Sequence, residues 1–534
     1  MTKKFLSVIL ASLLLLSCFS TGLMSFAANK AEADIPIIFI AGGNCNLRSA
    51  DGRLIYPVEE PEGYIADAVK DCLPSFANAI LFGSIESYKA KFMEWMAPLY
   101  TEVILNKDGE NPNGSHPEMD METVWVNPNS ANCDLTRYTF GYDFRLDPYE
   151  SADSLARYID RVKAATGADE VSLFARCEGA SVMAAYLDAY GDEGIHKLAV
   201  YGSAFNGNEP VSKTFSGKIK IDADIADAYA SSFLIVGDEV INRYFWSLWD
   251  SLREIYGIEI TASVANNLYR SVIRKILPDF LLSSYATFVG AWPMVRDEDY
   301  QEALDFIFYN DEIKAEYKGM YDKITYYHDH AAAKFEERLL AFKESGREVG
   351  VFSPYGFTEK PLFVGCDDLS DGDLKLVDSS FGATTAKWGK TLSDSYIAEA
   401  EQNGTAKYIA PDKQVDASTC LFPDTTWFFK NCYHGTYCAS LDAPMIAFFH
   451  TPGMTVDTFE QYPQYMIFHE DTFTTEIMTE ENCHTEDGNI FDEARPTNSG
   501  FFASLIKFFK TVFNFISLLL KGEEVNFSFG LKYM

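Results

Sequence analysis

The sequence predicts an α/β protein with a mostly parallel sheet, and three observations support this. The segment 34–43 (DIPIIFIAGG) is a continuous apolar run ending in glycines, as expected for a strand that is buried on both faces and leads into a loop. A helical pattern at 151–167 precedes a second apolar strand at 171–174. A helix at 180–189 then separates that strand from a third at 197–205. Strand–helix–strand order of this kind requires right-handed crossovers and therefore parallel pairing.

A long helical insert divides this α/β core into two parts. Helical, aromatic-rich patterns dominate the chain from 213 to 346, and a block of this size between two halves of a sheet is expected to form a cap over the functional site. The core resumes with further expected elements: a strand at 347–356, a loop at 368–380, a strand at 425–430 and a closing helix at 440–449. We therefore expect a first core part at 28–212, the helical cap at 213–346, a second core part at 347–455 and a C-terminal extension at 456–534.

The N-terminus reads as an export signal. Two lysines, Lys3 and Lys4, precede an apolar run and then small residues, and SFAA at 25–28 provides a cleavage site. The resulting signal peptide would span 1–27, giving a secreted or cell-surface protein. A second reading takes LLSC at 15–18 as a lipoprotein box with Cys18 as the lipidated residue, although leucine is not the favoured type two positions before the cysteine.

Composition limits the partners and the redox state. The formal net charge of −34 excludes a nucleic-acid partner, because phosphate binding needs clustered lysine and arginine. Of the ten cysteines, nine remain once Cys18 is set aside, and an odd number in an exported protein predicts a free thiol after any pairing. No C-x-x-C spacing occurs, so no metal site is expected.

The tail at 500–521 is apolar but carries a polar stripe. Lys507 and Lys510 would each cost about 2.5–3.5 kcal/mol at a bilayer centre. An amphipathic helix lying in the membrane surface is therefore favoured over a membrane span. Packing of this helix on the core is the alternative.

The chain's candidate nucleophile is Cys177. Ala175-Arg176-Cys177-Glu178-Gly179 fits the G-x-S-x-G nucleophile elbow with Ala for the first glycine and Cys for serine. The expected strand and helix flank it, and a helix N-terminus favours a thiolate. The alternative is a small buried cysteine that packs without reacting.

Two residues further along the chain could complete a catalytic triad. In this architecture the order is nucleophile, acid, histidine, and Asp371 and His434 follow Cys177 in that order, each in a loop beside an expected strand. The acid is the less certain choice, because other aspartates crowd the loop and an EF-hand-like calcium loop is a weak alternative. These are Asp367, Asp368, Asp373 and Asp378. His450 is the rival base, and Arg145 is expected to be a buried partner of a carboxylate.

These motifs resemble the lecithin–cholesterol acyltransferase-like branch of the α/β-hydrolases. YDFRLDP at 142–148 is similar to the family's Y-D-W-R-x-x-P segment, SDGDL at 370–374 resembles its acid loop, and IFIAGG at 38–43 resembles its oxyanion strand. The resemblance implies an α/β-hydrolase fold and acyl transfer through a covalent acyl-enzyme. It also implies Cys177 as nucleophile, Asp371 as acid and His434 as base, with backbone N–H groups of Gly43 and Glu178 as the oxyanion hole.

The departures from the family pattern define the alternative function. Most members have serine at the nucleophile and histidine before it, where this chain has Cys177 and Arg176. Dienelactone hydrolases and polyhydroxyalkanoate synthases resemble it in using cysteine, and a thiol favours thioesters and acyl transfer. We therefore expect an acyl hydrolase or acyltransferase that needs no cofactor and acts on an ester or thioester, lipids included. The alternative is a surface or binding protein that has kept the fold and lost catalysis.

Overall fold

The computed structural model describes most of the chain between residues 35 and 483. The described residues are 35–43, 46–58, 64–118, 135–224, 226–227, 234–236, 239–254, 256–358, 367–483 and 529–531. The predicted signal peptide at 1–27, Cys18 and the predicted amphipathic helix at 500–521 lie outside them. No helix among the described residues combines the length and apolar character needed to cross a membrane.

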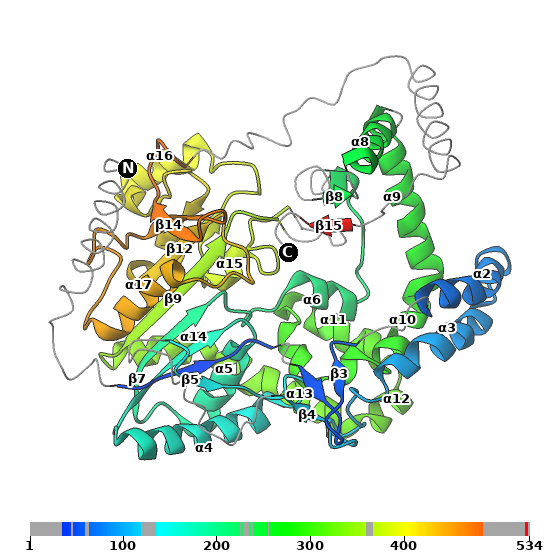
Figure 1. Ribbon diagram of the computed structural model, residues 1–534, viewed down its shortest axis with the longest axis horizontal. Coiled ribbons are helices and arrows are strands. Elements are labelled where there is room, and N and C mark those ends of the chain that lie inside the picture. The colour runs from blue at the N-terminus through cyan, green and yellow to red at the C-terminus, as the bar shows by residue number, and fades with distance from the viewer. Residues whose placement is uncertain are drawn as a thin grey trace, which may run out of the picture.

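An eight-stranded sheet forms the centre of the molecule (Figure 1). All neighbouring strands pair in parallel except the last pair, which is antiparallel, so the predicted mostly parallel α/β sheet is confirmed. In spatial order the strands are β5 (Tyr138–Phe140), β1 (Ile37–Ile40), β6 (Val171–Arg176), β7 (Ile195–Tyr201), β9 (Glu348–Tyr355), β12 (Thr426–Lys430), β13 (Tyr465–His469) and β14 (Thr474–Ile477).

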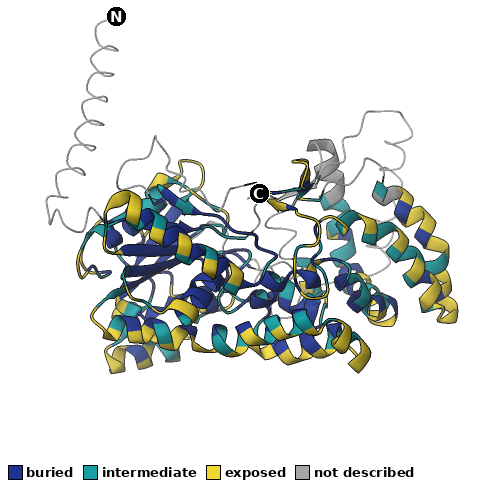
Figure 2. Cartoon of the chain, turned by 90° about the horizontal axis from the view of Figure 1, so that it is seen from below, coloured by how far each residue is buried: buried dark blue, intermediate teal, exposed yellow. Residues whose placement is uncertain are grey.

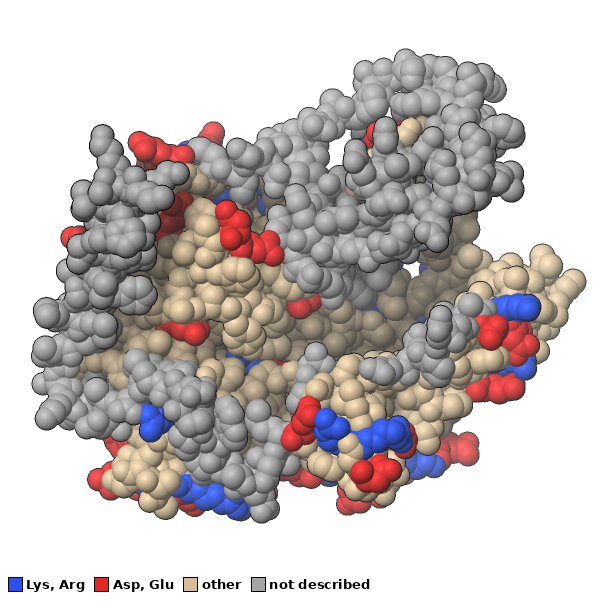
Figure 3. Space-filling model, in the orientation of Figure 1, with Lys and Arg blue, Asp and Glu red and all other residues tan. Residues whose placement is uncertain are grey.

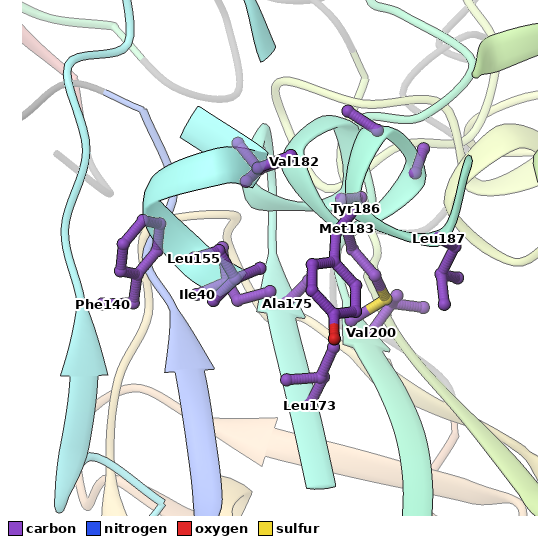
Figure 4. Close-up of a cluster of buried hydrophobic side chains, with 14 of the residues drawn as sticks. Ile40, Phe140, Leu155, Leu173, Ala175, Val182, Met183, Tyr186, Leu187 and Val200 are labelled. Carbon is purple, nitrogen blue, oxygen red and sulfur yellow. The ribbon is translucent and has the colours of Figure 1, made fainter. Parts of the chain in front are cut away.

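The central strands are mostly apolar because both faces of the sheet are covered. In β1, Ile38 and Ile40 point into one hydrophobic core, and Ile37 and Phe39 point into the other. The first core is closed by α4 (Pro148–Thr166), α5 (Gly179–Tyr190) and α14 (Phe335–Glu344), as the labelled side chains of Figure 4 show in part. The second is closed by α17 (Ala439–His450). Figure 2 shows the dark-blue buried strands between helices whose outer surfaces are exposed.

Two features of the core differ from the sequence-based boundaries. The sheet continues past residue 455, because β13 and β14 pair with it beyond the expected closing helix α17. At the other boundary, α14 falls within the expected cap but packs on the sheet. Its Phe335, Leu339 and Phe342 are buried in the first core, at a spacing that places all three on one helical face.

Most of the remaining helices form a second body beside the sheet. It contains α6 (Glu209–Phe215), α8 (Glu239–Glu254), α9 (Gly257–Leu268), the π-helical turn η1 (Tyr269–Ile273), α10 (Arg274–Leu281), α11 (Asp297–Ile307), α12 (Asp311–Glu316) and α13 (Lys318–His330). A separate hydrophobic core holds much of it together. The helices α2 (Tyr64–Phe82) and α3 (Ile85–Tyr100), from the first core part of the sequence, pack on η1 and α10 through Tyr88, Val272 and Ile276. Short strands β8 (Leu234–Val236) and β15 (Phe529–Leu531) pair nearby.

Candidate active site

Cys177 lies at a sharp turn between β6 and α5. Its φ is 51°, a conformation that non-glycine residues rarely adopt and that is typical of a nucleophile elbow. Gly179 permits the turn, because a Cβ there would lie 2.6 Å from the carbonyl oxygen of Ile40 and 2.7 Å from that of Ala41. Cys177 is only partly buried as a residue. It thus stands just before the first turn of α5 and is not sealed in the core.

His434 and Asp371 form a hydrogen-bonded pair. The Nδ1 atom of His434 lies 2.7 Å from Oδ2 of the buried Asp371 carboxylate, and the backbone N–H of His434 donates to the Asp371 carbonyl at 2.9 Å. The other oxygen of Asp371 accepts N–H bonds from Asp373 at 3.0 Å and Leu374 at 2.7 Å. Asp371 is thus fixed on both sides and presents one oxygen to the imidazole.

Electrostatics couple Cys177 to this pair. Burial opposes protonation of His434. The Asp371 carboxylate, followed by the charge and hydrogen bond of Cys177, outweighs burial and holds the pKa of His434 well above its usual value. A protonated imidazole beside a cysteine stabilises the thiolate, which is the reactive form. The structure therefore brings together the three residues that the sequence singled out.

Arg176 anchors the loop that carries His434. Its side chain is 5% exposed, and Nη2 donates to the carbonyl oxygens of His434 at 2.5 Å and Thr436 at 3.1 Å. The guanidinium carbon lies 3.3 Å from the centroid of the Tyr437 ring and 4.7 Å from that of Tyr201. Arg176 thus positions the loop of the candidate base.

The expected oxyanion hole lies between the β1 loop and the start of α5. Neither the Gly43 nor the Glu178 backbone N–H donates a hydrogen bond to any group that the structure describes. The two residues are adjacent, since a Cβ on Gly43 would lie 1.8 Å from Oε2 of Glu178. Whether these N–H groups act as oxyanion donors stays a prediction.

The Glu178 side chain is an unexpected part of this site. It is 8% exposed and makes no hydrogen bond or ion pair with the described residues. Burial, followed by the charges of Cys177 and Asp143, raises the pKa of Glu178 well above its usual value. A carboxyl group that resists ionisation therefore lies beside the candidate nucleophile.

Three of the four other aspartates of the Asp371 loop have cationic partners. Lys387 pairs with Asp367 and Asp368, and Asp378 pairs with Arg296. No group of three or more His, Cys, Asp or Glu side chains in the described part of the chain is arranged to hold a metal ion. Arg145 is fully buried and binds Asp143 through Nε at 2.9 Å and Nη2 at 2.6 Å, as the sequence predicted.

Six cysteines lie within the described residues, and all are free thiols. Cys432 is close to the site, with Sγ 3.4 Å from the Tyr201 hydroxyl, but it is fully buried, and burial raises its pKa to about 12. Cys438 is the other partly exposed thiol of this set. Among these thiols, Cys177 alone combines exposure with a histidine partner. Cys45, Cys133 and Cys366 lie outside the described residues.

A cavity of about 360 Å³ lies between the residues that follow β7 and those of α13. Phe205 and Tyr327 line it. Ala204, just before Phe205, donates its N–H to the Cys177 carbonyl at 3.2 Å. None of Cys177, Asp371 and His434 lines the cavity itself.

Comparison with known proteins gives limited information. No protein-family model and no curated protein matches the chain. One similar solved structure is the Tle4–Tli4 complex, at 13% identity and a TM-score of 0.17, covering 34% of this chain and 48% of that one. Another is the product of the gene lin2722 from Listeria innocua, at 17% identity and a TM-score of 0.16, covering 34% of this chain and 56% of that one. The chain spans about half the length of each, and likeness at this level carries no conclusion about substrate.

Proposed function

We propose that the protein is an α/β-hydrolase-type acyl hydrolase or acyltransferase with a Cys177–His434–Asp371 triad. The observation that carries the proposal is the placement of Cys177. It occupies a turn with φ of 51° and interacts with a histidine whose Nδ1 lies 2.7 Å from a buried aspartate. The motifs that resemble lecithin–cholesterol acyltransferase-like hydrolases support the same assignment.

The reaction follows from these groups. His434 takes the thiol proton, and Cys177 Sγ attacks the carbonyl carbon of an ester or thioester. The N–H groups of Gly43 and Glu178 stabilise the resulting oxyanion. The imidazolium then protonates the leaving alcohol or thiol, which departs and leaves an acyl-cysteine. Water or an alcohol attacks this thioester with His434 as base, releasing acid or new ester and restoring the thiol.

Glu178 suits this reaction because it resists ionisation. A second carboxylate beside the nucleophile would repel both the thiolate and the developing oxyanion. A raised Glu178 pKa keeps that charge absent over a wider pH range than an ordinary glutamate would. A neutral carboxyl group beside Gly43 leaves the oxyanion site without an opposing charge.

The cellular setting is part of the proposal. The N-terminal pattern at 1–27 supports export, and the apolar tail at 500–521 supports contact with a membrane surface and a lipid-like substrate. N-terminal sequencing of the mature protein tests export. A chain that keeps residue 1 and stays in the cytoplasmic fraction would contradict it.

Alkylation of Cys177 tests the triad directly. In the wild type, iodoacetamide should modify Cys177 faster than Cys438, because a neighbouring imidazolium stabilises the thiolate, which is the reacting form. In the His434→Ala variant that reactivity should fall, whereas alkylation of Cys438 should not change. Slow labelling of Cys177, or labelling indifferent to His434, would support a catalytically silent protein instead.

A further inference from the structure

A second large cavity lies in the helical body, away from the triad. It has a volume of about 620 Å³ and is bounded by the end of α6 with its following loop and by α9, η1 and α10 (Figure 1). Its lining is basic: Lys213, Lys218, Lys220, Arg270 and Arg274 all contribute. This is unusual in a chain with 44 lysines and arginines against 78 aspartates and glutamates.

Local carboxylates neutralise only two of these five cations. Lys213 Nζ lies 2.6 Å from Asp299, and Lys218 Nζ lies 2.7 Å from both Asp299 and Glu302. Asp299 is therefore shared between two lysines. The carboxylates on this side of the cavity form their ion pairs with these two lysines.

The other three cations have no carboxylate partner among the described residues. Arg274 donates from Nε to the Gly217 carbonyl at 2.9 Å and lies over the Phe306 ring, which fixes its guanidinium and leaves both Nη groups available. Arg270 donates from one nitrogen to Asn267 at 2.7 Å. Lys220 is exposed and makes no ion pair within the described residues. Elsewhere on the molecule, blue and red groups lie side by side along the lower right of the face in Figure 3.

We propose that this cavity binds a phosphate-type anion. Two guanidinium groups and an ammonium group provide several charge-assisted donors, and guanidinium geometry matches phosphate oxygens. The cavity falls within the range of about 300–1,000 Å³ typical of small-molecule sites and exceeds the size of one phosphate group. The ligand is therefore a phosphate carried on a larger molecule, either a soluble solute or a lipid headgroup. The site is independent of the chemistry proposed for Cys177.

Titration of the full chain with inorganic phosphate tests the site. The wild type should show saturable binding by calorimetry, and the Lys220→Gln/Arg270→Gln double variant should bind at least about tenfold more weakly, because charged hydrogen bonds are lost. Arg274 is not mutated, because its side chain also donates a hydrogen bond to the Gly217 carbonyl. Lys70→Gln/Lys334→Gln is the matched control: it removes the same charge from two exposed lysines outside the cavity and should bind like the wild type. Absence of saturable binding, or equal loss in both double variants, would overturn the proposal.

Vesicle binding identifies the source of the phosphate. If phosphatidylglycerol vesicles bind the wild type but not the Lys220→Gln/Arg270→Gln variant, and inorganic phosphate displaces them, the ligand is a lipid headgroup. If inorganic phosphate binds through these residues but vesicle binding does not depend on them, the ligand is a soluble phosphate ester. No dependence on the two residues in either arm rejects the site. Cys177→Ala should bind phosphate normally, so failure of the proposed catalysis and failure of this site are distinguishable.

Discussion

Replacing Arg176 with methionine should loosen the loop that carries His434. Methionine keeps apolar bulk between Tyr201 and Tyr437 but removes the donors to the carbonyls of His434 and Thr436. Hydrogen bonds to a charged group contribute about 1.5–3 kcal/mol each, so two of them amount to about 3–6 kcal/mol. Sulfur–aromatic contacts of about 0.3–1.5 kcal/mol offset part of this loss. We expect the free energy of unfolding to fall by about 2–5 kcal/mol.

Two measurements test this expectation. Denaturant unfolding of Arg176→Met is compared with that of Arg157→Met. Within the described part of the chain, the Arg157 guanidinium makes a single exposed hydrogen bond, to Ser154, so its loss should change stability by no more than about 0.5 kcal/mol. The pH profile of Cys177 alkylation supplies a readout that a purely structural role would not move, and it should shift to higher pH in Arg176→Met. Equal unfolding midpoints for the two variants, together with an unchanged alkylation profile, would refute the positioning role.

Three further expectations concern the site. Asp371→Asn should lower turnover of a p-nitrophenyl ester by about 10⁴-fold, as the matching change does in serine triads, since the amide cannot stabilise the imidazolium; near-wild-type single-turnover rates would contradict this. Glu178→Gln should leave stability unchanged below the ordinary glutamate pKa of about 4.3 and raise the free energy of unfolding increasingly above it. The reason is that the folded-state pKa of Glu178 is raised, so the wild type loses stability as pH rises toward that value; a pH-independent difference in urea unfolding argues against it. Gly43→Ala places a Cβ 1.8 Å from the Glu178 carboxyl and should slow ester turnover by about 10²-fold or more. It should affect iodoacetamide alkylation much less, because alkylation forms no oxyanion, and equal losses in the two reactions would count against an oxyanion role.

The sheet could be predicted from the sequence where burial on both faces removes polar residues. β1 is a continuous apolar run, and β6, β7, β9 and β12 are mostly apolar with a few polar residues, so their pattern is visible in one dimension. β5 has only three residues, and β13 and β14 follow the helix expected to close the core. These strands belong to the sheet because they pair with partners elsewhere in the fold. The local sequence pattern does not encode such pairing.

The site could be predicted in part for the same reason. Cys177, Asp371 and His434 stand at strand ends, and chain order indicates their candidate roles. The role of Arg176 depends on a carbonyl 258 residues away in the chain, and no sequence pattern reports that contact. The Glu178 side chain turns toward Gly43, a placement that only the folded elbow reveals.

Intact-mass analysis is the most direct test of the proposed chemistry. The wild-type protein is exposed to a panel of p-nitrophenyl esters and acyl thioesters, quenched in acid, and its mass compared with that of Cys177→Ala. An acyl adduct that maps to Cys177 and is absent from the variant is the expected result. No adduct with any of these acyl donors, or an adduct that persists in Cys177→Ala, would contradict acyl transfer through this thiol.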